Sequence, residues 1–286
     1  MSRRPFLPLL CLALASCGGG NEASPSGQPS EQPSATASTP ASTAPATPQP
    51  TPSASATATP APSGPNDVKE TNDLYSFAYS WPAAAGNIPA LAKRLEGELE
   101  KSKRELIANA NKGKAQAESN GFPYNPHFYS EKWKVVANLP HWLSLTGDFS
   151  TYTGGAHGNY GRDTLVWDKT VGRGFPAIEM FTSPKALSEA LDGRLCKALG
   201  RERARKRKGQ PKGDSLPEFD KCVGADQATV LVGSSNGKTF DRVGVWFGPY
   251  VAGPYAEGAY ELTFGVDQAI LDTVKPAYRA AFSLRH

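Results

Sequence analysis

A serine between two glycines is the first candidate for chemistry in this chain. Residues 233–237 read Gly-Ser-Ser-Asn-Gly, which fits the Gly-x-Ser-x-Gly pattern of hydrolases. That pattern exposes a nucleophilic serine only where a strand leads into it and a helix follows. Here the sequence from Lys238 to Phe247 is strand-like, and Asn236-Gly237 favours a two-residue hairpin turn. We therefore predict a turn at this position and no nucleophile.

Histidines and carboxylates form no recognisable catalytic or metal-binding pattern. No two histidines stand at the spacing of metal ligands, and the sequence has neither a phosphate-binding glycine loop nor a dinucleotide fingerprint. Asp163 and Glu179 could form an acid/base pair in space, but nothing in their spacing indicates that they do. We predict no cofactor, no metal and no catalytic residue, with His157 hydrogen-bonded within a turn.

Two segments rich in glycine and tyrosine are the candidate ligand-binding surface. The first spans residues 152–159 and the second spans residues 247–258. Their glycines permit positive φ angles and close approach of the backbone, and their aromatic rings offer flat faces to a ligand. Packing of the two segments on each other for purely structural reasons is the alternative. The predicted ligand-binding residues are Tyr152, Gly154, Gly155, His157, Tyr250 and Tyr255.

A mixed set of strands and helices must position these segments. Aromatic and small residues alternate over 75–81, which is typical of a strand with one aromatic face. A leucine stripe at helical spacing begins after Pro89, and Ser183-Pro184 is typical of the start of a second helix. Further strands are expected over residues 132–139, 143–152, 163–167, 228–232, 242–247 and 259–266, with a closing helix over 267–280. This order predicts an α+β fold, with a mainly antiparallel sheet packed with two or three helices.

The amino-terminal residues predict export. Residues 3–15 combine a basic start with an apolar run that is too short to span a membrane. Leu14-Ala15-Ser16-Cys17 resembles the bacterial lipobox, which implies cleavage after a signal peptide of residues 1–16 and lipidation of Cys17. The protein would then be anchored to a membrane through its lipid. The residue after Cys17 is Gly18. Because aspartate at this position would signal retention in the inner membrane, glycine favours the periplasmic face of the outer membrane.

The stretch that follows cannot form a hydrophobic core. Residues 17–66 consist mainly of glycine, serine, threonine, alanine, proline and glutamine, with almost no large apolar side chains. Such a composition predicts a disordered tether, because it buries too little surface to offset the entropy of ordering the chain. The remaining residues, 67–286, suit one α+β domain or two subdomains over 67–160 and 161–286.

Cysteine usage agrees with an exported protein. Cys11 belongs to the predicted signal peptide and Cys17 would carry lipid, so Cys196 and Cys222 are the only cysteines left. In an oxidising compartment this remaining pair predicts a disulfide.

Positive charge gathers near the end of the second predicted helix. The chain has a net charge of +4, and seven cations lie close together: Arg201, Arg203, Arg205, Lys206, Arg207, Lys208 and Lys212. Export makes nucleic acid an unexpected partner, whereas an anionic envelope polymer or lipid head group would suit the run. Because such runs usually face solvent, we expect a solvated helix end and loop.

The two segments rich in glycine and tyrosine carry a resemblance to known families. Tyr-Thr-Gly-Gly-Ala-His at residues 152–157, followed by Pro-Tyr-Val-Ala-Gly-Pro-Tyr-Ala-Glu-Gly at residues 249–258, resembles the paired domain-of-unknown-function families 4163 and 3298. The aromatic strand fits the same pattern, so the resemblance covers about residues 74–271. Relatives in these families include the lysozyme-sensing ectodomain of an anti-sigma factor and an accessory region of a peptidoglycan deacetylase. The family pattern often has proline after the histidine, where this chain has Gly158.

The resemblance implies a fold, an envelope setting and a binding role, and we carry over neither sigma-factor signalling nor deacetylation. We predict a non-catalytic module that binds peptidoglycan or a protein that attacks it, such as lysozyme. Lysozymes are commonly cationic, so the basic run would repel them if it lay at the interface. A hydrolase of envelope glycan and a structural spacer lipoprotein are the alternatives. Clustering of the aromatic residues around a carboxylate-lined cleft would favour the enzyme, and an open aromatic face would favour the binding module.

Overall fold

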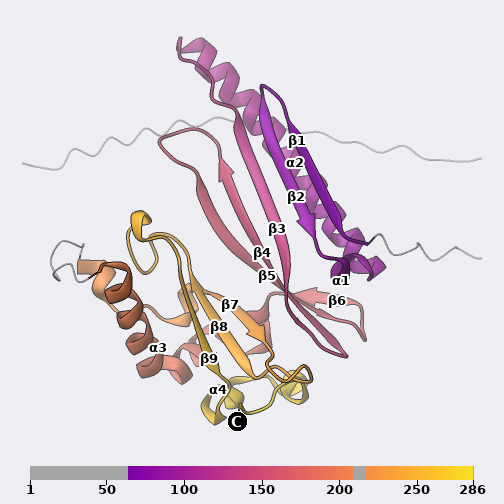
Figure 1. Ribbon diagram of the computed structural model, residues 1–286, viewed down its shortest axis with the longest axis vertical. Helices are drawn as coiled ribbons and strands as arrows, with labels where there is room; N and C mark the ends of the chain where they lie inside the picture. Colours follow the sequence, from indigo (N-terminus) through magenta and orange to yellow (C-terminus); the bar gives the residue numbers. More distant parts are fainter. Residues whose placement is uncertain (1–63, 209–216, 286) are drawn as a thin grey trace, which may run out of the picture. The chain divides into compact units, whose positions relative to one another are not determined.

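The computed structural model describes residues 64–208 and 217–285 (Figure 1). The predicted signal peptide, the lipidation site Cys17, almost all of the predicted tether and Lys212 lie outside the described residues. Within the described ranges, no helix combines the length and the apolar character that crossing a bilayer requires. The first strand begins at Asn66, at the predicted end of the tether.

A six-stranded sheet forms the first half of the described chain. Its strands, in spatial order, are β1 (Asn66–Thr71), β2 (Tyr75–Trp81), β3 (His127–Asn138), β4 (Trp142–Tyr152), β5 (Asn159–Asp168) and β6 (Arg173–Phe175). All neighbours are antiparallel except β2 and β3, which are parallel. A parallel pair needs a long crossover connection, which α1 (Ala83–Gly86) and α2 (Pro89–Ser119) supply. The predicted α+β fold with a mainly antiparallel sheet is confirmed.

The long helix α2 covers one face of this sheet. Proline at its first position costs no helical hydrogen bond and presets the backbone angle. The predicted leucine stripe is buried against the aromatic face of β2, where Phe77 and Tyr79 are almost fully buried. Burying one such large apolar side chain stabilises the fold by about 1.5 to 3 kcal/mol. This first core therefore fixes α2 on the sheet.

A β-bulge in β3 divides the sheet between two cores. The pairing register with β4 shifts between Val135 and Ala137, as happens where an extra residue is inserted into one strand. Trp133, before the shift, packs in the first core beneath α2, whereas Ala137, after it, packs in a second core. The same strand thus contributes side chains to both cores.

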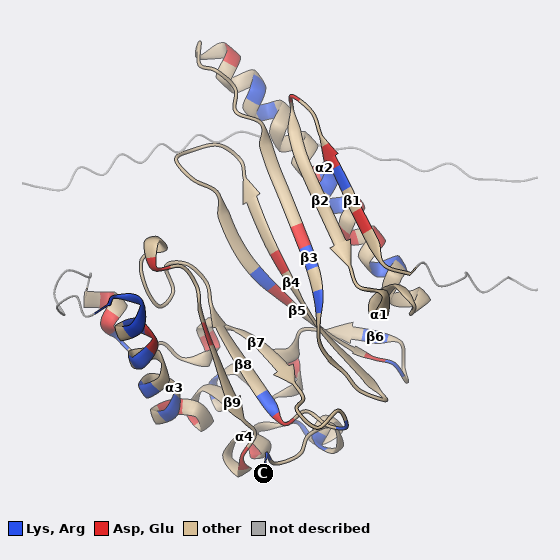
Figure 2. Cartoon of the chain, in the orientation of Figure 1, with Lys and Arg blue, Asp and Glu red and all other residues tan. Residues whose placement is uncertain are grey.

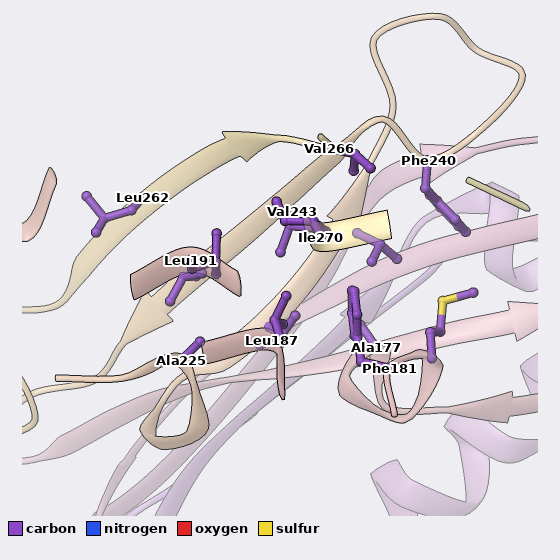
Figure 3. Packing of buried hydrophobic residues seen from close by; sticks show 14 of the residues in the cluster. Ala177, Phe181, Leu187, Leu191, Ala225, Phe240, Val243, Leu262, Val266 and Ile270 are labelled. Atoms are coloured by element: carbon purple, nitrogen blue, oxygen red, sulfur yellow. The ribbon is translucent and has the colours of Figure 1, made fainter. Parts of the chain in front are cut away.

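The second core is built by a smaller sheet and two helices. Its elements are β7 (Thr229–Gly233), β8 (Arg242–Phe247), β9 (Tyr260–Gly265), α3 (Pro184–Lys206) and α4 (Gln268–Thr273). The three strands are antiparallel in sequence order. Figure 3 shows Leu187 and Leu191 of α3 packed close to Val243 of β8 and Ile270 of α4.

Most predicted elements are confirmed, with differences at their ends. Both β3 and β5 begin earlier than predicted, and β1 has no counterpart in the sequence prediction. The predicted closing helix is wrong: α4 ends at Thr273, and a separate 3-10 helix covers Pro276–Ala281. The ring of Pro276 cannot donate the hydrogen bond that a continuous helix requires. Residue 160 lies inside β5, and the division of residues 67–286 into two subdomains stays a prediction.

The serine between glycines lies in a turn, as predicted. The backbone N–H of Ser235 donates to Oδ1 of Asp241 at 2.7 Å, and the Ser235 hydroxyl bonds the same carboxylate. The predicted two-residue hairpin is wrong, because the connection between β7 and β8 spans residues 234–241. Oδ1 of Asn236 accepts hydrogen bonds from the backbone N–H groups of Lys238 and Thr239, which stabilises this longer turn.

The predicted disulfide is confirmed. Cys196 of α3 is joined to Cys222, and their Cα atoms are 5.2 Å apart. The start of α3 is also as predicted, since the Ser183 side chain accepts from the backbone N–H of Ala186. A cap at the start of α3 and a covalent bond at its middle therefore fix the helix against the second core.

Candidate functional site

Three predicted ligand-binding residues form one cluster, which we call the aromatic patch: His157, Tyr250 and Tyr255. The rings of His157 and Tyr255 are stacked, with centroids 4.1 Å apart and 25° between their planes. The ring of Tyr250 lies 5.6 Å from that of Tyr255, and its hydroxyl is 3.4 Å from Nε2 of His157. Tyr250 is 53 % exposed and Tyr255 is half-buried. The two segments therefore meet at an accessible surface.

The backbone of Gly158 holds the aromatic patch together. Its carbonyl oxygen accepts hydrogen bonds from the Tyr255 hydroxyl and from Nδ1 of His157, each at 2.8 Å. A proton on Nδ1 leaves Nε2 of His157 as the acceptor for the Tyr250 hydroxyl. A Cβ at position 158 would lie 2.8 Å from the carbonyl oxygen of Thr151, so glycine permits a close approach of two chain segments.

Cations at the end of α3 hold the loop between β8 and β9, which carries both tyrosines of the aromatic patch. Nε of Arg203 donates to a carbonyl oxygen of this loop at 2.9 Å. Nζ of Lys206 donates to the carbonyl oxygen of Glu257 at 2.7 Å, and Nε of Arg207 pairs with the Glu257 carboxylate at 2.7 Å. We call these three cations the α3 clamp. Figure 2 shows the basic end of α3 in blue.

The predicted solvated helix end is wrong for the α3 clamp. Arg203 is only 6 % exposed, and the other two cations of the clamp are partly buried. Positions three and four apart lie on the same side of a helix, so residues 203, 206 and 207 face the loop together. The other described cations of the run are exposed, namely Arg201, Arg205 and Lys208.

The carboxylate of Glu257 is the centre of this arrangement. Partial burial would raise its pKa, but hydrogen bonds from Arg207 and Tyr260 outweigh that effect and hold the pKa below its ordinary value. The same Arg207 donates to Asp220 at 2.6 Å. An ionised Glu257 therefore fixes the loop to α3 and orients the patch that the loop carries.

The other three predicted ligand-binding residues, Tyr152, Gly154 and Gly155, line a separate pocket beside the C-terminal end of α2. This pocket, which we call the terminal pocket, has a volume of about 480 Å³. Gly154 and Gly155 have φ angles of 100° and 92°, which residues other than glycine rarely adopt. The Tyr152 hydroxyl donates to the carbonyl oxygen of Gly155 at 3.0 Å. The first glycine- and tyrosine-rich segment thus contributes to both the terminal pocket and the aromatic patch.

His127 also lines the terminal pocket, and sequence reasoning missed it. Its side chain is 4 % exposed, and Nδ1 has no hydrogen-bond partner in the described part of the chain. Burial lowers its pKa, so the imidazole is neutral near pH 7. A period-two reading of β3 could have found it, because His127 is in phase with the inward-facing Tyr129 and Glu131.

A second cleft lies between α2 and the sheet, and sequence reasoning missed most of it. This α2 cleft has a volume of about 320 Å³ and is lined by Arg94, Glu98, Lys101, Ser102, Glu105, Tyr129, Glu131, Trp133, Asp163, Thr164 and Pro176. Glycine at position 147 of β4 leaves room for the side chain of Glu131, because a Cβ there would lie 2.8 Å from Oε1 of Glu131. Asp163 therefore shares a cleft with Glu131, whereas Glu179 is exposed on the 3-10 helix Ala177–Met180.

Glu131 is the most perturbed carboxylate of this cleft. Burial raises its pKa to about 7, and the nearby negative charge of Asp163 adds to the rise. The Tyr129 hydroxyl donates to Oε2 of Glu131 at 2.6 Å, which opposes the rise without cancelling it. The sequence signal was a carboxylate at an inward position of a strand, between Tyr129 and Trp133.

No metal centre is apparent in the described part of the molecule. Within residues 64–208 and 217–285, no three His, Cys, Asp or Glu side chains stand close enough together to hold a metal ion.

Part of the chain matches a family model built from known proteins. Residues 68–160 match the family model described as Deacetylase PdaC. Solved structures that resemble the chain at a low level include two from the DUF3298 family. A DUF3298 family member from Bacteroides fragilis is 17% identical, with a TM-score of 0.45, over 73% of this chain and 91% of that one. A DUF3298 family protein from Pseudomonas aeruginosa is 18% identical, with a TM-score of 0.43, over 78% of this chain and 98% of that one.

No match was found among curated proteins. The DUF3298 family predicted from the sequence is thus represented among the structures that resemble this chain, and the matched family model covers the predicted aromatic strand. The resemblance to family 4163 stays a prediction.

Proposed function

We propose that this protein is a lipid-anchored module of the cell envelope that binds the glycan of peptidoglycan without altering it. The observation that carries this proposal is the aromatic patch, in which the exposed ring of Tyr250 lies against the stacked rings of His157 and Tyr255. The pyranose rings of a glycan have apolar faces of C–H groups, and flat aromatic rings bury such faces while the sugar hydroxyls stay in water.

The rigid support of the aromatic patch favours binding. Tyr255 is fixed by its hydroxyl to Gly158, and the loop that carries it is fixed by the α3 clamp. A surface that is already ordered loses little conformational entropy when a ligand arrives. The family model matched by residues 68–160 bears the name of a deacetylase, which is compatible with an acetylated polymer as the ligand class.

Calorimetry with soluble peptidoglycan fragments tests the proposal. For the full chain purified in detergent, we expect saturable binding that Tyr250→Ala weakens by about 1 to 3 kcal/mol, because exposed tyrosines often act as binding anchors. Val171→Ala is the matched control, since Val171 is 69 % exposed on the turn that follows β5, and the opposite end of β5 lies next to His157. Equal affinity of the wild type and Tyr250→Ala would contradict the proposal.

Lysozyme forms a second arm of the same experiment. If lysozyme binds in a manner that depends on Tyr250 and no glycan binds, the ligand is a peptidoglycan-attacking protein and not the glycan. Part of the electrostatic objection is removed, because Arg207 of the basic run is paired with the carboxylates of Asp220 and Glu257.

A hydrolase of envelope glycan is the second candidate function, and the α2 cleft is the observation that favours it. Glycosidases use one protonated and one ionised carboxyl group near the scissile bond. Glu131, with a pKa of about 7, would be the acid, and Asp163, whose pKa burial also raises but from a lower ordinary value, would be the carboxylate. Turnover of a peptidoglycan substrate by the wild type, lost in Glu131→Gln, would establish this function.

The anchor is part of the proposal. We propose that Cys17 carries lipid and holds the protein at the periplasmic face of the outer membrane. Metabolic labelling with an alkynyl fatty acid should mark the wild type and leave Cys17→Ser unlabelled. Undiminished labelling of Cys17→Ser would contradict the proposal. Cys11→Ser is the matched control, because Cys11 lies within the predicted signal peptide and its loss should leave labelling unchanged.

A further inference from the structure

The terminal pocket has the chemistry of a site for an uncharged, polar ligand. No Asp, Glu, Lys or Arg lines it. Its lining combines three side-chain amides with aromatic rings and the backbone of a glycine turn: Gln116, Asn120, Asn125, Phe122, Tyr124, Tyr152, Gly154 and Gly155. Amides both donate and accept hydrogen bonds, and aromatic faces bury C–H groups. The volume of about 480 Å³ lies within the usual range for small-molecule pockets.

His127 supplies a directed donor in this pocket. Its Nδ1 is buried with no partner in the described part of the chain. A buried N–H without a partner costs more than a buried lone pair without one, so the proton belongs on the other nitrogen, Nε2. The hydroxyl of neighbouring Tyr124 is already engaged, since it donates to the carbonyl oxygen of Leu74 at 2.7 Å. The Nε2–H of His127 is therefore available to a carbonyl oxygen of a ligand.

The terminal pocket and the aromatic patch are adjacent along the chain. Gly155 lines the pocket and His157 belongs to the patch, so at most about 7 Å of backbone separates them. One extended ligand could therefore contact both surfaces, which neither a small solute nor an isolated sugar would do.

We infer that the terminal pocket holds an uncharged, acetamido-bearing sugar unit of the same glycan, with Nε2–H of His127 donating to the acetamido carbonyl oxygen. This inference rests on the proposed function and names the chemical group that the site selects. The amide side chains complete the recognition of the acetamido N–H and the ring hydroxyls, and the aromatic patch binds a neighbouring unit.

Two oligosaccharides that differ only in acetylation test the inference by calorimetry on the full chain in detergent. The probes are chitotetraose, with four acetamido groups, and its fully deacetylated counterpart, with four amines. We expect the acetylated probe to bind at least tenfold more tightly to the wild type. His127→Phe keeps a ring of similar size without a donor, and it should reduce this preference to less than threefold.

Gly113→Ala gives a second test that does not remove the histidine. A Cβ at position 113 would lie 2.7 Å from ring atoms of His127, so the ring must move. Alanine favours a helix more than glycine does, so the fold should be kept. Gly97→Ala on the same helix is the matched control, because nothing lies within 4 Å of its Cβ. We expect Gly113→Ala to weaken binding of the acetylated probe at least fivefold and Gly97→Ala to leave this binding unchanged.

The outcomes separate this inference from the function on which it rests. If both probes bind the wild type equally and Tyr250→Ala weakens both, the glycan-binding function stands and the inference about the terminal pocket is overturned. Unchanged preference in both His127→Phe and Gly113→Ala overturns it as well. If neither probe binds at all, the inference and the proposed function both fail.

Discussion

Two carboxylates in different parts of the molecule, Glu131 and Glu257, are both largely removed from solvent and yet titrate in opposite directions. Glu131 lies beneath α2 in the first core, where burial raises its pKa to about 7. Glu257 lies beside α3, where Arg207 and Tyr260 hold its pKa below the ordinary value in spite of partial burial. The difference is the partner: Glu257 has a guanidinium, and Glu131 has the neutral hydroxyl of Tyr129.

This comparison indicates what each region does. A carboxylate with a charged partner stabilises the fold when it is ionised, so Glu257 and the α3 clamp serve to order the loop that carries the aromatic patch. A buried carboxylate with no charged partner destabilises the fold when it is ionised. Glu131 is therefore either a cost of the local packing or a group kept for chemistry in the α2 cleft.

The largest expected effect concerns Glu131. Its pKa is about 7 in the folded protein and 4.5 when unperturbed, so the folded state binds the proton more tightly. The free energy of unfolding should therefore fall as pH rises from 4.5 through 7. Glu131→Gln should remove this loss and be more stable than the wild type by about 3 kcal/mol at pH 8, since one pKa unit corresponds to about 1.4 kcal/mol.

Urea unfolding of the wild type and Glu131→Gln at pH 4.5, 6 and 8 measures this effect. The advantage of the variant should be nearly lost at pH 4.5, where the wild-type carboxyl is protonated in the folded state and about half protonated in the unfolded state. Glu105→Gln is the matched control, because Glu105 lines the same cleft with a side chain that is 63% exposed. A lower stability of Glu131→Gln at pH 8 would show that the ionised carboxylate is stabilised by contacts that outweigh burial.

The smaller expected effect concerns Glu257 and has the opposite sign. Glu257→Gln removes a charge-assisted pair whose side chains are each 15% exposed, and it should lower the free energy of unfolding at pH 7 by about 2 kcal/mol. The contribution of Glu257 is fully present above its unperturbed pKa of 4.5 and is lost as pH falls through its lowered folded value.

The same unfolding series, extended to pH 3, measures this second effect. The deficit of Glu257→Gln should shrink below pH 4.5, whereas Glu218→Gln, at an exposed position, should match the wild type throughout. A deficit that does not depend on pH would mean that Glu257 acts through packing alone, and the contrast between the two carboxylates would lose its basis.

Local patterns were sufficient to predict much of the fold. The alternation over 75–81, the leucine stripe after Pro89 and the cap at Ser183 are all confirmed, because each depends on neighbours a few residues away. The disulfide was predictable because Cys196 and Cys222 are the two cysteines left once Cys11 and Cys17 are assigned to the signal peptide and the lipid anchor. The position of β1 was not, because an edge strand of polar residues looks like the end of a tether and gains its order from β2.

The site was predictable only in part. The segments around His157 and Tyr255 could be singled out by their unusual glycine and tyrosine content, and they do meet. The inward face of the basic run, the acidity of Glu131 and the pocket at His127 depend on which elements pack against them. The spacing along the strand or helix indicates that these residues face inward, but the groups that surround them come from distant parts of the chain.

Co-sedimentation with purified, insoluble peptidoglycan is the most direct test of glycan binding through the aromatic patch. We expect that the full chain in detergent pellets with the polymer in a saturable manner, that Tyr250→Ala pellets much less, and that Val171→Ala pellets like the wild type. A wild-type chain that stays in the supernatant at every polymer concentration, or a Tyr250→Ala chain that pellets equally well, would show that the patch does not bind the glycan.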